Sequence, residues 1–207
     1  MGSPPELPAA FFARQDESDD AEFYREPRFV THIDDVTIAA LTQYYREHLA
    51  PEHRVLDLMS SWISHLPEEV RYRSVTGHGM NAEELAANPR LDDYQVQNLN
   101  QNPTLPFSDG AFDAVLIAVS VQYLTRPFEV FAEIGRVLAP DGQCIVAMSH
   151  RLFPTKAVYA FHVLSGEERC RVVAAYLDAA GVFETIRSVD RSPPQGDPLW
   201  IVHGISA

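Results

Sequence analysis

The chain has 207 residues, of which 46% are hydrophobic, and a formal net charge of −13 at pH 7. A chain of this size and composition can bury a sizeable core as a single domain. Its acidity disfavours nucleic acid or an anionic membrane surface as the main partner, because both carry negative charge. No apolar run approaches the roughly 18–20 residues that cross a bilayer, and we expect no signal peptide, since the start of the chain lacks a basic segment followed by an apolar one.

The N-terminal segment, residues 1–34, is predicted to precede a single domain at 35–207 as a separate strap or lid. In one interpretation its apolar side chains pack it over the core. In the other, Tyr24, Arg28 and His32 face a bound ligand, so that the segment covers a site. The apolar side chains that would hold a simple strap are Phe23, Phe29 and Ile33.

The first half of the domain alternates strand and helix patterns. Ile38, Leu41 and Tyr45 fall on one helical face, and an aspartate stands before them as a cap. Val55-Leu56-Asp57-Leu58 has the length and apolar content of a buried strand. The expected elements are a helix from Asp34 or Asp35 to Leu49, a strand at 54–58, a short helix between 64 and 67, a strand ending at 75–79, a helix at 81–88 and a strand at 94–98.

Residues 105–149 form the clearest crossover unit in the chain. A buried strand is predicted at 112–119, followed by a helix that begins near Pro127 and ends before the Pro-Asp-Gly turn at 140–142. A second apolar strand follows at 144–148. Strand, helix and strand in this order indicate a right-handed crossover in a parallel sheet that helices cover.

The C-terminal part predicts a different kind of pairing. An amphipathic helix is expected from Glu167 to Ala180, where Gly181 ends it. Two alternating runs, 182–189 and 199–205, then flank a loop rich in proline and glycine. This pattern is typical of an antiparallel hairpin, which would close an otherwise parallel sheet of seven strands.

The motifs LPFSDGAFDAV at 105–115 and EIGRVLAPDG at 133–142 resemble the fourth and fifth strands of class I S-adenosylmethionine (SAM)-dependent methyltransferases. Within that family the chain looks like the small-molecule enzymes similar to the ubiquinone and menaquinone C-methyltransferases, and the resemblance extends over roughly 54–149. The resemblance implies a Rossmann-like α/β three-layer sandwich whose mostly parallel seven-stranded sheet ends in an antiparallel hairpin. It also implies SAM as the cofactor and a small molecule as the methyl acceptor.

The loop after the first strand departs from the family pattern. Asp57 matches, but the positions of the family's alternating glycines hold Met59, Ser61 and Ile63. Glycine at these positions lets the backbone come close to the methionine end of SAM and adopt positive φ. Either the serine hydroxyls hold SAM in a shifted pose, or Met59 and Trp62 fill the space and no SAM binds.

The end of the second strand departs as well. Gly79 occupies the position of the family's ribose-binding acid, and His78 or Asn81 would have to replace it with neutral hydrogen bonds. Asn98 stands where the family often has an aspartate that recognises adenine. The cofactor-binding residues that the resemblance implies are Asp57, Met59, Ser60, Ser61, Gly77, His78, Gly79, Asn81, Asn98, Leu99 and Ser120.

Three side chains are candidates for positioning or deprotonating a methyl acceptor, namely His150, Tyr123 and His32. Alternatively, His150 is a solvated loop residue and Tyr123 packs beneath its loop. No His or Cys pairs have metal-ligand spacing, so no metal is expected. Cys144 and Cys170 are expected to be reduced thiols of a cytoplasmic protein. Two functions remain open, a SAM-dependent methyltransferase or a methyltransferase-like protein without catalysis that binds another ligand or a protein; the oligomeric state is open too.

Overall fold

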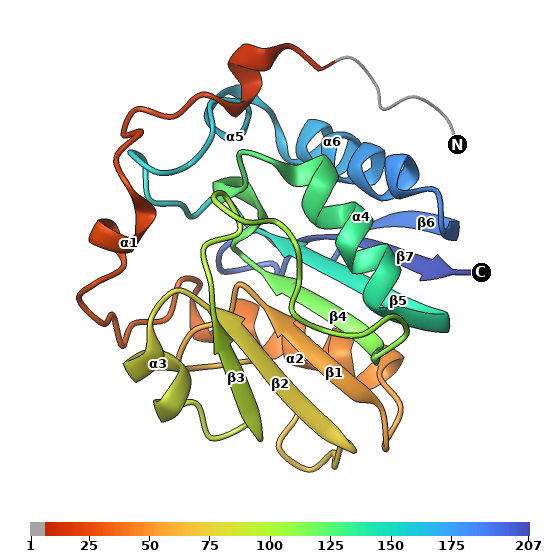
Figure 1. The fold of residues 1–207 in the computed structure, drawn as a ribbon. Coiled ribbons are helices and arrows are strands. Elements are labelled where there is room, and N and C mark those ends of the chain that lie inside the picture. Colours follow the sequence, from red (N-terminus) through yellow and green to blue (C-terminus); the bar gives the residue numbers. More distant parts are fainter. Residues whose placement is uncertain (1–6) are drawn as a thin grey trace.

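One seven-stranded sheet, in the order β3-β2-β1-β4-β5-β7-β6, organises the computed structural model, which describes residues 7–207 (Figure 1). The five strands from β3 to β5 are parallel, whereas β7 runs antiparallel to both of its neighbours, β5 and β6. This arrangement confirms the predicted mostly parallel sheet with an antiparallel C-terminal hairpin. The strands are β1 (Arg54–Leu58), β2 (Ser74–Gly79), β3 (Asp93–Val96), β4 (Phe112–Ala118), β5 (Leu138–Met148), β6 (Phe183–Asp190) and β7 (Trp200–Ser206).

Helices cover both faces of this sheet, which gives the predicted three layers. Leu41 and Tyr45 of α2 are fully buried against one face, and Phe131 of α4 and Val173 of α6 are buried against the other. Alternate residues of each central strand supply the two cores. The α-helices are α1 (Asp20–Phe23), α2 (Asp35–His48), α3 (Ala82–Ala87), α4 (Pro127–Val137), α5 (Ala160–Val163) and α6 (Gly166–Ala180), and the 3₁₀ helices are η1 (Ala9–Phe12) and η2 (Val121–Tyr123).

Capping hydrogen bonds and a glycine set the ends of the longer helices. The Asp34 side chain accepts a hydrogen bond from Thr37 N–H (2.9 Å) and caps α2. Ser165 and Glu168 form a capping box at the start of α6, and Gly181 ends that helix with φ 72°. The predicted turn after α4 lies inside β5, where residues 139–142 oppose the single residue Asp113 of β4.

The short helix predicted after β1 is wrong, because residues 59–73 contain no helix. Side chains of neighbouring elements occupy the backbone and hydroxyl groups of this loop. Asn88 Nδ2 donates to the carbonyl of Ser61 and to Ser64 Oγ, both at 2.9 Å. The Trp62 indole N–H donates to the carbonyl of Val30 (3.0 Å), which ties the loop to the N-terminal segment. These contacts hold the loop in an irregular conformation.

The described part of the N-terminal segment, residues 7–33 (the strap), runs from α5 past the strand ends to α3 (Figure 1). The remaining residues of the segment predicted at 1–34 are Asp34, which caps α2, and residues 1–6, which lie outside the described part of the chain. The strap backbone pairs with the segment before α5 at two points, from Asp16 N–H to the Thr155 carbonyl and from Tyr159 N–H to the Ala13 carbonyl.

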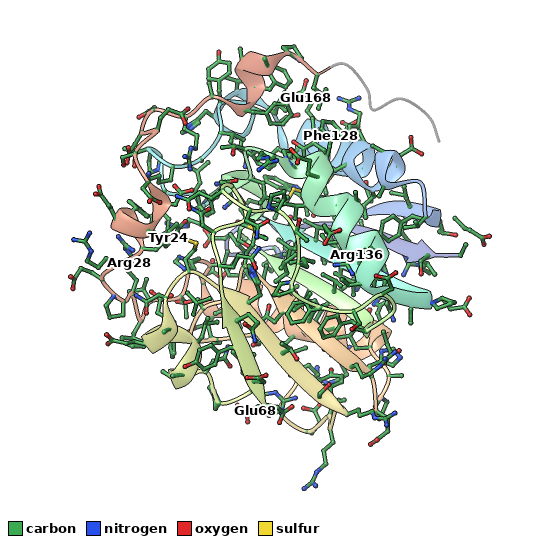
Figure 2. All side chains as sticks on the ribbon, in the orientation of Figure 1. Tyr24, Arg28, Glu68, Phe128, Arg136 and Glu168 are labelled. Atoms are coloured by element: carbon green, nitrogen blue, oxygen red, sulfur yellow. The ribbon has the colours of Figure 1, made fainter. Side chains whose placement is uncertain are left out.

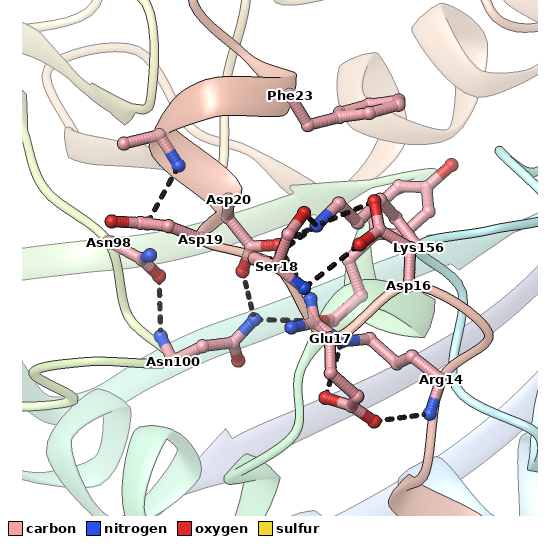
Figure 3. A network of polar contacts seen from close by, with 12 residues as sticks. Arg14, Asp16, Glu17, Ser18, Asp19, Asp20, Phe23, Asn98, Asn100 and Lys156 are labelled. Carbon is pink, nitrogen blue, oxygen red and sulfur yellow. Dashed lines mark hydrogen bonds and ion pairs between the residues drawn. The ribbon is translucent and has the colours of Figure 1, made fainter.

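A buried ion cluster anchors the strap (Figure 3). Lys156 is the only lysine of the chain and has no exposed surface. Its Nζ lies 3.1 Å from Asp16 Oδ2 and 3.2 Å from Asp20 Oδ1. Asp20 also pairs with Arg14 Nη1 at 2.7 Å and accepts a hydrogen bond from Asn100 Nδ2 at 2.9 Å. Asp20 therefore joins both cations and the loop after β3.

Between residues 7 and 207, no helix is both long and apolar enough to span a bilayer.

We predict that Asp20→Asn loosens the strap, because it removes the central anion from a buried ion cluster. Loss of one partner of a buried pair costs about 3 kcal/mol, which corresponds to roughly a 100-fold change in an opening equilibrium. Amine-reactive labelling of Lys156, followed by mass spectrometry, should accelerate accordingly.

Asp16→Asn is the matched control, because the Asp16 side chain is 35% exposed against 5% for Asp20. It should raise the labelling rate much less. Equal rates in the two variants would contradict the central role of Asp20.

Candidate functional site

A pocket that is partly open to solvent lies at the edge of the sheet where β1, β2 and β4 end. The loops after these strands, the start of α3 and the loop after β3 form its walls. Strap residues cover it, among them Tyr24 and Arg28, which are labelled in Figure 2. Ile33 of the same strap is buried in the core. The strap therefore packs on the domain and also faces the pocket.

All the predicted cofactor-binding residues except Gly77 line this pocket. Gly77 lies within β2, where a Cβ atom would come within 2.3 Å of Leu91 Cδ1. Its role is therefore close packing of α3 and the following turn against the strand. The other residues come from four separate segments, which the fold brings to one edge of the sheet.

The loop after β1 keeps a glycine-like backbone without glycine. Met59 has φ 59°, a left-handed conformation that costs a side-chain-bearing residue about 1–2 kcal/mol. Ser60 stabilises the turn, because its N–H donates to the His78 carbonyl (2.7 Å) and its Oγ donates to Asp57 Oδ2 (2.6 Å). The loop thus binds the ends of both β1 and β2.

The glycine that this chain does have at the site lies across from that loop. A Cβ atom on Gly79 would come within 2.5 Å of the Ser60 carbonyl oxygen, a backbone atom that has little freedom to move. The backbone of the loop after β1 occupies the space that an acidic side chain at position 79 would need. The two departures from the family pattern, in that loop and at Gly79, are therefore coupled.

Asn81 is unavailable to a ligand, although it was predicted to replace the missing acid. Its Oδ1 accepts from the N–H groups of Glu83 and Glu84 and caps α3. Its Nδ2 donates to the carbonyls of Tyr24 and Arg25 in the strap. Two donors and two acceptor sites are all that an amide side chain has.

Burial shifts the protonation of the pocket's titratable groups. It raises the pKa of Asp57 to about 6, against the opposing effect of hydrogen bonds from Ser60 and Ser64. It lowers the pKa of His78 and of His65 to about 4 and also lowers the pKa of His32. His78 and His65, whose pKa values are about 4, are therefore neutral at pH 7. Asp57, whose pKa is about 6, is mostly ionised at that pH.

The remaining predicted cofactor residues form the wall below the strap. Asn98 Oδ1 accepts from Asn100 N–H (2.9 Å), so the side chain shapes its own turn. Leu99 is buried, and the buried Ser120 Oγ has no hydrogen-bond partner among residues 7–207. Next to Ser120, Val119 has φ 51°, a strained conformation for a β-branched residue. Strain of this kind clusters at functional sites.

The three residues predicted to serve catalysis do not lie together. Tyr123 and His32 line the pocket, whereas His150 lies outside it. His150 Nε2 is 3.0 Å from Asp197 Oδ1, and the His150 side chain is 52% exposed. Asp197, in the loop before β7, also binds Arg151. This contact between distant segments holds His150 away from the pocket, so the structure does not support it as a base.

Tyr123 has a clear structural contact. Its hydroxyl oxygen accepts a hydrogen bond from Phe153 N–H (2.8 Å), and the two rings stack with centroids 5.8 Å apart. Burial raises the pKa of Tyr123 to about 12, so its hydroxyl is neutral at pH 7. The residue therefore holds the segment after β5 against the pocket.

Several lining residues were not predicted from the sequence, including Arg14, Asp20, Glu84, Lys156 and Phe153. For Glu84 a signal existed, because it follows the cap Asn81 by three positions and so shares its helical face. For the ion cluster of Arg14, Asp20 and Lys156, the only hint in the sequence was that Lys156 is its single lysine. Residues 7–207 contain no group of His, Cys, Asp or Glu that could hold a metal ion.

Comparisons with known proteins find similarity to methyltransferases over part of the chain. A family model described as a methyltransferase domain matches residues 60–146. A demethylmenaquinone methyltransferase from Renibacterium salmoninarum is 39% identical over 62 residues, which cover 29% of this chain and 26% of that protein. The match thus spans about a quarter of the length of this curated relative.

Solved structures agree in fold. The cyclase SpnF is similar with a TM-score of 0.61 and 18% identity, and the alignment covers 80% of each chain. A SAM-dependent methyltransferase from Aquifex aeolicus is similar with a TM-score of 0.56 and 18% identity, over 84% of this chain and 99% of the other. At these identities the likeness concerns the fold alone.

We predict that Asp57→Asn changes the pH dependence of stability. Because the pKa is raised in the folded state, this carboxyl group lowers stability as the pH rises from about 4 to about 6. The cost at pH 7 is about 3 kcal/mol, since each pKa unit corresponds to about 1.4 kcal/mol. Urea unfolding at pH 4 and pH 7 should show Asp57→Asn gaining stability relative to wild type as the pH rises, while the exposed Asp178→Asn stays parallel to wild type. A parallel profile for Asp57→Asn would contradict the raised pKa.

We also predict that Gly79→Ala destabilises the protein by about 1–3 kcal/mol, the usual range for overpacking. The new methyl group would meet the Ser60 carbonyl. Gly135→Ala in α4 is the comparison, because its Cβ would come within 2.7 Å of Val182 Cγ2, a side-chain atom rather than a backbone atom, and alanine favours the helix, so this variant should lose less stability than Gly79→Ala. Similar urea midpoints for Gly79→Ala and wild type would refute the close contact.

Proposed function

Because the chain belongs to the class I SAM-dependent methyltransferase superfamily, we propose that it transfers a methyl group from SAM to a small-molecule acceptor. The observation that supports this most directly is the position of the pocket. Doubly wound sheets bind ligands at the carboxyl ends of the strands, where the strand order reverses. In the order β3-β2-β1-β4 that reversal lies between β1 and β4, and the pocket lies over their ends.

The part of the pocket wall that carries Asp57 and Glu84 fits a polar ligand group with positive charge, while the cationic lining residues Arg14, Arg28 and Lys156 belong to the strap or contact it. When bound, SAM supplies a methyl group activated by a sulfonium, and the C–S electron pair stays on sulfur as the acceptor atom bonds to the methyl carbon. Asp57 and Glu84 place buried carboxylates in the wall, where a cationic ligand is favoured. His78 and Ser120 add buried polar atoms without partners among residues 7–207. Leu99 and Leu124 offer apolar surface to a planar base.

The strap side of the pocket is suited to the acceptor. Tyr24, His32, Tyr123 and Phe153 line it, and the rings of His32 and Tyr123 both pack on Phe153. Such a wall would position a planar, partly apolar molecule, and positioning is a large part of the catalysis of a displacement reaction. A neutral His32 can accept a proton from an acceptor that must lose one.

Quinone-like and other small aromatic molecules are the first acceptors to test. The aromatic wall supports this class, and the curated relative that matches part of the chain is named for a quinone-type acceptor. We also place the protein in the cytoplasm, because both cysteines are buried free thiols.

A second candidate function is supported by the loop after β1. Met59 has a strained backbone conformation there, and no helix lies between that loop and β2. The structurally similar protein SpnF is a [4+2]-cyclase. A protein of this fold that binds its ligand without transferring a methyl group would suit the same pocket.

Isothermal titration with SAM and S-adenosylhomocysteine separates the two functions. For a methyltransferase we expect micromolar dissociation constants for the wild type, followed by release of S-adenosylhomocysteine in the presence of an aromatic acceptor. Met59→Gly should change the affinity several-fold, because it relieves about 1 kcal/mol of backbone strain and removes a side chain from the pocket wall.

Met59→Leu is the control for that variant, since it keeps both the bulk and the strained backbone. It should bind like the wild type. No binding of either compound at millimolar concentration by any of the three proteins would reject the methyltransferase.

A further inference from the structure

Arg28 brings a positive charge to the strap side of the pocket, and no acidic side chain neutralises it. It lines the pocket and is half-buried. Within residues 7–207 its guanidinium donates only to backbone carbonyls, those of Phe23 (2.7 Å) and Glu26 (3.4 Å), and it has no ion-pair partner. A guanidinium has five N–H groups. Arg28 therefore keeps hydrogen-bond donors for a ligand.

His32, four positions further along the strap, brings a base to the same side of the pocket. Burial lowers its pKa, the carboxylate of Glu84 on α3 opposes this shift, and the positive charge of Arg28 adds to it. In the loop after β1, His65 also faces His32, whose charge lowers the pKa of His65. His32 is therefore neutral at pH 7, and a neutral imidazole has one nitrogen that can accept a proton.

One aromatic ring, that of Phe153, brings Arg28 and His32 to the same place. The guanidinium carbon of Arg28 lies 5.6 Å from the centre of this ring, and the centre of the His32 ring lies 5.4 Å from it. Tyr123 stacks on the same ring at 5.8 Å. A cation, a base and aromatic surface therefore meet on the strap side of the pocket.

These groups select the kind of atom that receives the methyl group. Arg28 would repel an ammonium group, and a carboxylate has no proton to give to His32. An aliphatic hydroxyl group is too weak an acid for a histidine to ionise. A phenol has a pKa near that of tyrosine, about 10, and a positive charge close to it lowers that pKa by about 1–3 units.

We propose that Arg28 and His32 bind a phenolic hydroxyl group of the acceptor and prepare it for O-methylation. This inference rests on the proposed function, in which SAM is the methyl donor. His32 takes the hydroxyl proton, while the N–H groups of Arg28 hold the oxygen as negative charge develops on it. The oxygen bonds to the methyl carbon, and the electron pair of the broken C–S bond stays on sulfur. The products are an aryl methyl ether, S-adenosylhomocysteine and an imidazolium that returns its proton to water.

The test of Arg28 uses 4-nitrophenol, because its phenolate absorbs visible light and its neutral form does not. Just below the pKa of the free probe, the wild type with bound S-adenosylhomocysteine should raise the ratio of phenolate to phenol about tenfold, the effect of one nearby positive charge. Arg28→Gln should lose most of this increase, and Arg28→Lys, which keeps the charge, should retain much of it. Arg25→Gln is the matched control, because Arg25 is exposed on the same strap and does not line the pocket.

The role of His32 is tested by methyl transfer. With SAM, the wild type should convert 4-nitrophenol to 4-nitroanisole, which removes the visible absorbance. His32→Gln should lower kcat by about 100-fold, as expected for loss of a general base, while it binds 4-nitrophenol with nearly unchanged affinity. A loss of affinity with kcat unchanged would contradict a base at this position.

Other outcomes overturn the assignment as a whole. Equal phenolate fractions in the wild type and in both Arg28 variants would do so, as would a wild type that binds 4-nitrobenzoate more tightly than 4-nitrophenol or that neither binds nor converts 4-nitrophenol. In each case binding of S-adenosylhomocysteine by the wild type would leave the methyltransferase intact. Failure to bind S-adenosylhomocysteine as well would overturn both proposals.

Discussion

The contact between the backbone of Ser60 and the bare α-carbon of Gly79 determines how the whole site is built. It brings the loop after β1 against the end of β2, where Ser60 N–H binds the His78 carbonyl. A side chain on residue 79 would push the two segments apart. The close approach that the family obtains with glycines in the first loop is obtained here with glycine on the second strand.

That contact has consequences for charge. Without an acid at the end of β2, the carboxylates of the pocket that lie beside the loop after β1 are Asp57 and Glu84, and both are buried. The third pocket carboxylate, Asp20, is paired with Arg14 and Lys156. Asp57 and Glu84 are each bound by a serine hydroxyl of the same loop, by Ser60 and Ser61 respectively. The serines that replace glycine therefore orient the acids. Buried carboxylates without cationic partners are costly, which is consistent with a site that awaits a positively charged ligand.

The strap completes the pocket by a second set of buried charges. Lys156 and Arg14 converge on Asp20, and Asn100 joins this cluster to the loop after β3. Because these groups are shielded from solvent, their mutual attraction is much stronger than that of surface pairs. The strap is thereby held across the strand ends, with Tyr24, Arg28 and His32 toward the pocket.

The sequence by itself determined the sheet, its order of elements and the edge at which the site lies. Apolar runs, helix caps and turn residues act over a few positions, so they can be recognised one segment at a time. Only the tertiary structure decided which polar groups remain free. The Asn81 side chain makes all its hydrogen bonds with the start of α3 and with the strap. His150 pairs with Asp197, which lies 47 positions away in the sequence, whereas Glu84 faces the pocket. Such pairings depend on distances between remote segments, which no local pattern in the chain records.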